Sequence, residues 1–229
     1  DDWTQIVAIE AFSGAGLAPV PGTDARTIIA DNPAGSQRIT PNQTNPITST
    51  ADGVAEFEIA DPTVALRGSD TAQAPNLVIH LNTTQGCAGK FVSIKYDVRD
   101  IDGSANNAVS QVNTQYRIGG TGPYTNVTFG YLADGTTGPS QATSVVQRTG
   151  TLPFAATGQP MVDVRIMTTN AAGLDEWVGI DNINVDCVHL TAGTAVVSGQ
   201  VRDSNGRGLS KTRVSVIDPN TNIVRTVIT

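Results

Sequence analysis

The sequence has few of the residues on which several common protein functions depend. Its 229 residues include 14 Lys or Arg against 21 Asp or Glu, for a formal net charge of −7. No basic run is present, and an acidic surface lacks the phosphate-neutralising patch that nucleic-acid binding requires. No apolar run approaches the roughly 18 residues of a membrane span. The composition therefore argues against nucleic acid as a partner and against membrane insertion.

Side chains typical of catalysis and of sugar stacking are also scarce. His80 and His189 are the only histidines, and neither lies in a recognisable nucleophile motif. Only five Phe, four Tyr and two Trp are present, whereas sugar-binding clefts generally use aromatic platforms, so the low aromatic content argues against a glycosidase. We therefore predict that the protein is not an enzyme.

The two cysteines, Cys87 and Cys187, lie 100 residues apart and outside any metal or redox motif. Two interpretations are open, a disulfide or a pair of buried free thiols. Abundant Thr, Ser, Asn and Gly with little Lys are typical of secreted proteins and favour the disulfide. We therefore expect an extracellular or cell-surface protein, and we interpret the chain as a mature form without its leader.

The dominant pattern in residues 1–187 is the alternation of apolar and polar residues. It is clearest at residues 55–59, 92–98 and 162–166, and no segment of helical length shows a 3.6-residue period. Further strands are expected at 5–12, 76–82, 115–119, 127–132, 144–148 and 177–186, and a surface loop at 32–50. About ten short strands separated by Gly, Pro, Asn and Asp predict an all-β, jelly-roll-like antiparallel sandwich.

A second, smaller β domain is expected after a linker at residues 188–194. Residues 195–229 contain three predicted strands, at 197–201, 212–218 and 223–229. Three strands cannot bury a two-sheet core, so we expect this domain to be incomplete by itself.

The pattern Ser198-Gly199-x-Val201-x-Asp203, followed by Gly206, Leu209 and the Val214/Val216 alternation, carries a resemblance. It resembles the opening of a carboxypeptidase-regulatory-like domain, which has an immunoglobulin- or transthyretin-like β-sandwich fold. The resemblance implies that residues 195–229 form part of such a sandwich.

A second resemblance rests on six segments of the larger region, between about Ala65 and Val185. They are Leu66-Arg67-Gly68-Ser69, Val98-Arg99-Asp100-Ile101-Asp102-Gly103, Gln115-Tyr116-Arg117, Ala133-Asp134-Gly135-Thr136-Thr137-Gly138-Pro139-Ser140, Arg165-Ile166-Met167-Thr168-Thr169-Asn170 and Asp175-Glu176-Trp177-Val178-Gly179-Ile180-Asp181-Asn182-Ile183. Together they resemble an accessory β-sandwich of large secreted bacterial multidomain proteins, some of them linked to nucleases. The resemblance implies an accessory role, and no nuclease motif occurs in this chain.

The segment around Asp181 predicts a β-bulge. Val178 and Ile180 share one strand phase, whereas Ile183 and Val185 share the opposite phase. A regular strand cannot bury all four on one face, because side chains alternate with period two. One extra residue at Asp181-Asn182 would restore the register.

Oxygen ligands gathered at such a bulge suit Ca²⁺, which takes six to eight of them. The candidate ligands are Glu10, Asp175, Asp181 and Asn182. The alternative is that these side chains only cap turns or lie in water.

Two functions are open. The first is a surface fibre subunit that assembles with copies of itself by β-strand complementation, because the C-terminal strands would leave open edges. The candidate pairing residues are Val197, Val201, Val214, Val216, Val224 and Val227. The second is a calcium-dependent carbohydrate- or surface-binding accessory module. Tyr124 and Tyr131 would then form a platform for surface glycans, unless they pack within the sandwich.

Overall fold

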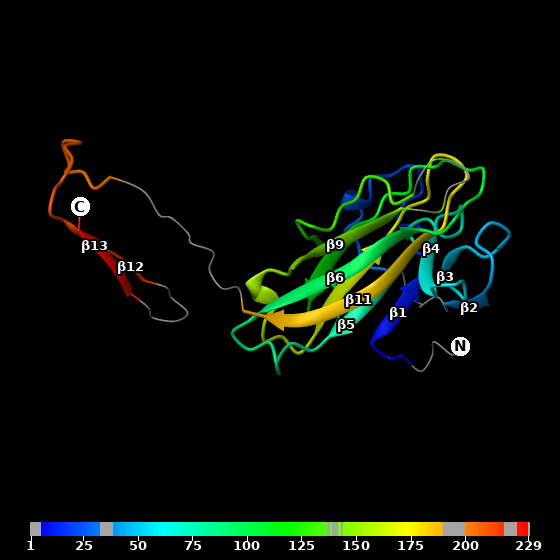
Figure 1. The fold of residues 1–229 in the computed structure, drawn as a ribbon, viewed down its shortest axis with the longest axis horizontal. Coiled ribbons are helices and arrows are strands. Elements are labelled where there is room, and N and C mark those ends of the chain that lie inside the picture. Colours follow the sequence, from blue (N-terminus) through cyan, green and yellow to red (C-terminus); the bar gives the residue numbers. More distant parts are fainter. Residues whose placement is uncertain are drawn as a thin grey trace. The chain divides into compact units, whose positions relative to one another are not determined.

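The computed structural model describes residues 6–32, 39–136, 138, 142, 144–189, 200–217 and 224–228 (Figure 1). The chain divides into two compact units, Asp1–Val188 and His189–Thr229. Within the described residues, no helix is both long and apolar enough to cross a membrane.

The first unit consists of two β-sheets. One has the strand order β1 (Ile9–Phe12), β5 (Asn76–Leu81), β10 (Val162–Met167), β7 (Asn113–Ile118), β8 (Thr125–Asn126). The other has the order β2 (Thr40–Gln43), β3 (Gly53–Phe57), β4 (Thr63–Arg67), β11 (Val178–Val188), β6 (Phe91–Asp100), β9 (Val145–Thr151). Two short 3-10 helices, η2 (Ala25–Thr27) and η3 (Phe154–Ala156), lie in the connections.

The strand order is that of a jelly roll. β4 to β7 alternate between the sheets, and β8 to β11 retrace the same path, so that β4 lies beside β11, β5 beside β10, β6 beside β9 and β7 beside β8. These pairs are antiparallel, as in a long ribbon wrapped around a core. The predicted all-β, jelly-roll-like sandwich is therefore confirmed.

The core lies between the two sheets and is built from alternate residues of the strands. Leu77 and Ile79 of β5 face it from one sheet, and Ile94 of β6 and Val178 and Ile180 of β11 face it from the other. All five are buried. The period-two pattern in the sequence thus marks the inward face of each sheet.

The outer face of each sheet is partly covered by a connecting segment. On the second sheet, Phe57 packs edge-on against Trp177 with ring centroids 4.9 Å apart, together with Ala55 and Ala65. On the first sheet, a smaller cluster combines Ala18, Ile28, Ala74 and Met167. Because of these clusters, several outward-facing strand positions are also apolar and buried.

The predicted bulge is present in β11. Its register against β6 shifts between Asp181 and Asn184, and Asn182 has a positive φ of 51°. The extra residue returns Ile183 to the inner face, where it packs against the core.

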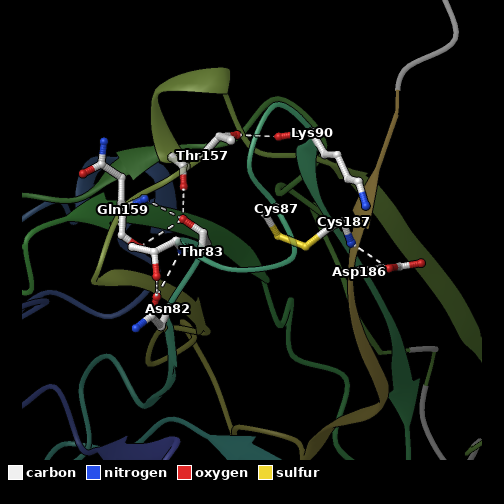
Figure 2. Close-up of a disulfide and its surroundings, with 10 residues drawn as sticks. Asn82, Thr83, Cys87, Lys90, Thr157, Gln159, Asp186 and Cys187 are labelled. Carbon is white, nitrogen blue, oxygen red and sulfur yellow. Dashed lines mark hydrogen bonds between the residues drawn. A yellow bond between two sulfur atoms is a disulfide. The ribbon is translucent and has the colours of Figure 1, made fainter.

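The predicted disulfide joins Cys87, in the loop between β5 and β6, to Cys187 near the end of β11 (Figure 2). Their Cα atoms are 4.9 Å apart, and the bond closes a sequence separation of 100 residues. The prediction of a disulfide is confirmed, and the alternative of free thiols is wrong.

Two expectations about the larger unit are wrong in detail. Residues 127–132 form no strand, because Gly130 N–H donates to Val127 O at 3.1 Å in a turn and only Leu132 bridges Val112. The expected loop at 32–50 contains β2, a short edge strand that pairs with β3 in parallel. Its Pro41 is compatible with an edge position, where a missing N–H costs little.

The described part of the second unit contains one antiparallel pair, β12 (Arg213–Ile217) and β13 (Val224–Ile228). Val214 lies opposite Val227, Val216 opposite Arg225, and Val224 opposite Ile217. Val197 lies outside the described residues. Val201 is not in a strand, although its carbonyl accepts from Leu209 N–H at 2.8 Å. The second and third predicted strands are therefore observed at Arg213–Ile217 and Val224–Ile228, and residues 218, 223 and 229 of the predicted ranges lie outside the described residues.

Candidate functional site

Three loops meet at one end of the sandwich and form a polar cleft. They connect β4 to β5, β6 to β7 and β10 to β11. The cleft has a volume of about 380 Å³. The polar side chains that line it are Arg67, Ser69, Asp70, Asn106, Asn170 and Asp175.

Gly68 allows two of these loops to touch. A Cβ atom at this position would lie 2.5 Å from Asn170 Cα and 2.6 Å from Asp175 Oδ1. The backbone after β4 therefore runs directly against the loop before β11, which brings the side chains of both loops into one cleft. A larger residue would force the two loops apart.

Asp175 is the acidic group at the centre of this contact. Its Oδ1 accepts a hydrogen bond from Ala171 N–H at 2.7 Å. Burial raises the pKa of Asp175 to about 6, and the nearby Asp70 adds to the rise, although the Ala171 hydrogen bond and the charge of Arg67 oppose it. Asp175 therefore carries its charge at neutral pH and gains a proton in mildly acidic solution.

Arg67 forms a fixed wall of the cleft. Its guanidinium carbon lies 4.7 Å from the centroid of the Trp177 ring. Its nitrogens donate to Ser49 O, at 3.1 Å, and to Ala51 O. Burial lowers the pKa of Arg67 from its ordinary value, but the group remains a cation at neutral pH. Two of its N–H donors and one face of its guanidinium are thus used within the protein.

Glu176, the neighbour of Asp175 in the sequence, is a buried acid outside the lining of the cleft. Its Oε2 accepts from Ala108 N–H and from Thr136 Oγ1, both at 3.1 Å, so one carboxyl group ties together three connecting segments. Glu176 is only 2% exposed, and its Oε1 has no hydrogen-bond partner among the described residues. Burial, with Asp100 and Asp102 nearby, raises the pKa of Glu176 to about 7.

The structure does not bring the predicted calcium ligands together. Glu10 lies on the first sheet and pairs with His80 at 3.2 Å, whereas Asp181 lies on the second sheet and binds Arg99 at 2.7 Å. Asn182 donates to Asp97 at 2.9 Å, and Asp175 lies in the cleft.

The bulge turns Asp181 toward Arg99, which neutralises it, so the four predicted ligands do not form one site. Among the residues that the structure describes, no three acidic, His or Cys side chains form a group that could hold a metal. Calcium binding itself stays a prediction.

The predicted tyrosine platform is not formed. Tyr124 is 2% exposed, and its ring is contacted by Arg117 and Arg165, whose guanidinium carbons lie 4.4 and 3.9 Å from the centroid. Tyr131 is half-buried, with Arg26 4.0 Å above its ring. Both rings are occupied by cations of the protein itself, so Tyr124 presents no face to a sugar and Tyr131 shares its face with Arg26.

Sequence reasoning singled out Asp175 but missed Asp70, Asn106 and Asn170, and it gave Arg67 no role in a site. Asp70, Asn106 and Asn170 lie in loops, where polar side chains are common, and Arg67 is the last residue of β4. The available signal was Gly68 next to Arg67, because a glycine at a strand end often marks a close approach of two backbones.

No family model matches the sequence, and no curated protein matches it. The chain is similar to tailspike protein 4 of bacteriophage CBA120, in its enzymatically active domain, at 10% identity and a TM-score of 0.33. That match covers 56% of this chain and 16% of the tailspike chain.

Two further similar structures are carbohydrate-binding modules. One, CBM28, is described as specific for non-crystalline cellulose, with 10% identity, a TM-score of 0.42, and coverage of 66% of this chain and 99% of the module. The other, CBM4, has 14% identity, a TM-score of 0.34 and coverage of 79% and 95%. The two sheets of the structure itself show the β-sandwich, and membership of a family is not shown.

Proposed function

We propose that the unit Asp1–Val188 is a secreted, non-catalytic module that binds a neutral glycan in the cleft between its three loops. The observation that carries the proposal is the convergence of carboxylate, amide and hydroxyl groups from separate loops on one concave site. Its volume of about 380 Å³ lies in the range of small-molecule sites.

The chemistry of the lining matches that of a sugar. Hydroxyl groups of a glycan both donate and accept, and Asn106, Asn170 and Ser69 offer donors and acceptors to them. Asp175, charged at neutral pH, supplies a strong acceptor. Leu174, which also lines the cleft and is 72% exposed, offers apolar contact to the C–H face of a sugar ring.

The charges of the cleft favour a neutral ligand over an acidic one. Asp70 and Asp175 are both acidic, and the guanidinium of Arg67 is already bound to Ser49, Ala51 and the Trp177 ring. A uronic acid or sulfated sugar would therefore meet repulsion from two carboxylates, against a single guanidinium that already donates to two backbone carbonyls.

The scaffold keeps the cost of binding low. The loops extend from strands of a jelly roll that a disulfide also ties together. Because the site is largely formed before the ligand arrives, little conformational entropy is lost on binding.

The test is calorimetric titration of the full chain with soluble cello-, xylo- and manno-oligosaccharides, and a pull-down on amorphous cellulose. Cellulose and its oligosaccharides are chosen as probes because CBM28, one of the similar structures, is described as specific for non-crystalline cellulose. We expect binding of at least one neutral glycan, and a loss of roughly tenfold or more in affinity for Asp175→Asn and for Asn170→Ala.

Glu58→Gln is the matched control, since Glu58 is exposed and follows β3 at the opposite end of the sheet from Arg67. Equal affinity of Asp175→Asn and the control, or no binding of any neutral glycan, would refute the proposed site.

The predicted fibre role is a second candidate. The observation that favours it is β13, which pairs only with β12 in the described part of the chain. Such a strand has one edge available for pairing.

A further inference from the structure

β11 is longer than β4, the strand that pairs with it on one side. It pairs with β6 along its length but with β4 only from Val178 to Ile180. β4 begins at Thr63, whose Oγ1 donates to Ile180 O at 3.2 Å. Residues 183–187 of β11 therefore have no strand on this side within the described residues.

The orientation of the backbone identifies the groups at this open edge. The carbonyl oxygen of Val92 in β6 accepts from Leu152 N–H at 2.8 Å, so the backbone groups of Val92 point toward β9. Val92 lies opposite Cys187 in the pairing of β6 with β11. Because hydrogen-bonded and non-hydrogen-bonded pairs alternate in an antiparallel ladder, Val185 and Cys187 direct their N–H and C=O groups away from β6.

One of these groups is already bound locally. Cys187 N–H donates to the side chain of Asp186 at 2.7 Å, as Figure 2 shows. The N–H and C=O of Val185 and the C=O of Cys187 have no partner among the described residues. They are three groups that an added strand would pair.

Apolar surface lies exposed beside the same edge. Val185 is 37% exposed, although it shares its strand phase with Ile183 and Cys187, which pack against the core. A groove of about 300 Å³ lies between the start of β4 and the bulge of β11, and it is lined in part by Val64, Ile180 and Ile183. A strand laid along the edge would cover Val185 and place side chains in the groove.

The two units carry charge of opposite sign. Residues 1–188 contain 9 Lys or Arg and 19 Asp or Glu, for a net charge of −10. Residues 189–229 contain 5 Lys or Arg and 2 Asp or Glu, for a net charge of +3. Asp181 and Asp186 belong to this stretch of β11, and Arg225 lies in β13. A charge complement to the edge is thus present in the same chain.

We propose that the open edge of β11, residues 183–187, accepts β13 of a second copy of this chain by β-strand addition. β13 has five residues, which matches the length of the open edge, and it pairs only with β12 in the described residues. The contact joins different surfaces of the two copies, so it is head-to-tail and builds an open or ring-shaped assembly.

The first experiment is sedimentation velocity of the full chain over a range of concentrations. We expect concentration-dependent association that weakens as salt is raised from about 50 to 500 mM, because the charges are then screened. Hydrogen exchange should show protection of the Val185 amide that rises with protein concentration.

Val185→Pro removes the N–H that points to the open edge and leaves the ladder to β6 intact, whereas Val185→Thr keeps the N–H and serves as the control. We expect Val185→Pro to weaken association roughly fivefold or more and Val185→Thr to leave it nearly unchanged.

A charge-exchange pair keeps the test decisive if the proline variant folds poorly. Asp186→Lys and Arg225→Glu should each weaken association, and the double variant should recover it. Sedimentation as a monomer at every concentration would overturn the proposal. Equal protection of the Val185 amide from hydrogen exchange at all concentrations would also overturn it. Both outcomes are independent of the glycan cleft, because neither Asp186 nor Arg225 lines it.

Discussion

At the scale of single residues, Gly68 determines whether the cleft keeps its shape. Gly68→Ala places a Cβ 2.5 Å from the Asn170 backbone, which cannot yield as a flexible side chain would. We expect a loss of about 1–3 kcal/mol in the free energy of unfolding, measured with urea, and weaker glycan binding.

Gly208→Ala is the control for this variant, since a Cβ at Gly208 meets nothing within 4 Å. If both variants unfold at the same urea concentration and bind glycan equally, the close approach at Gly68 does not shape the cleft.

Glu176 should make stability depend on pH. Its pKa is raised from 4.5 to about 7 in the folded protein, so the folded state holds the proton more tightly than the unfolded state. The free energy of unfolding contributed by this group is therefore greatest below about pH 4.5 and declines as the pH rises to about 7. Glu176→Gln, which has no proton to lose, should flatten this decline in thermal melts between pH 5 and 8.

Asp175, with a pKa raised to about 6, acts in the same direction over a narrower range, so Asp175→Asn serves as the comparison. Asp24, Asp31 and Asp52 have pKa values lowered from 3.8, so the stability that they contribute is constant between pH 5 and 8 and is lost only in more acidic solution. Wild type and Glu176→Gln melting in parallel across this pH range would show that the carboxyl group is not buried as described.

At the scale of structural elements, the disulfide is a covalent constraint on the sandwich. It closes a separation of 100 residues between the loop after β5 and the end of β11. In the chain-entropy model such a link stabilises the folded state by about 4–5 kcal/mol. We expect the Cys87→Ser/Cys187→Ser variant to unfold at a markedly lower urea concentration than wild type, and reduced wild type to match the variant. Equal midpoints after verified reduction would contradict this role.

Most strands could be predicted because apolar and polar residues alternate along their sequence. β6 and β10 follow from this alternation, although every residue of β10 is buried, and the bulge in β11 follows from a change of phase between Ile180 and Ile183. β4 was missed because outward positions such as Ala65 are also apolar and covered, which hides the period of two. β2 was missed because an edge strand of polar residues and a proline resembles a loop.

The candidate site could not be assembled from sequence for a different reason. Arg67, Asn106 and Asn170 come from three loops, and their meeting depends on the order of strands in each sheet. That order is a property of the whole fold and leaves no local pattern. The predicted calcium ligands lie apart for the same reason: Glu10 and Asp181 belong to strands of different sheets, which the sequence does not reveal.

At the scale of the whole molecule, the difference in net charge between the two units can be counted from the sequence only once the boundary between the units is known. The average of −7 conceals an acidic first unit and a basic second one. The jelly-roll order was predictable only as a class, since many pairings of ten short strands satisfy the same alternation.

The position of Cys187, one residue before the end of β11, has a mechanical consequence. Any pull on residues 189–229 enters the sandwich through Val188 and reaches this covalent link almost at once. The load passes through Cys87 into the loop between β5 and β6, so β11 cannot be peeled from β6 one hydrogen bond at a time. A tethered unit would therefore resist traction by breaking many bonds together, and reduction of the sulfur bridge would turn that resistance into stepwise unzipping.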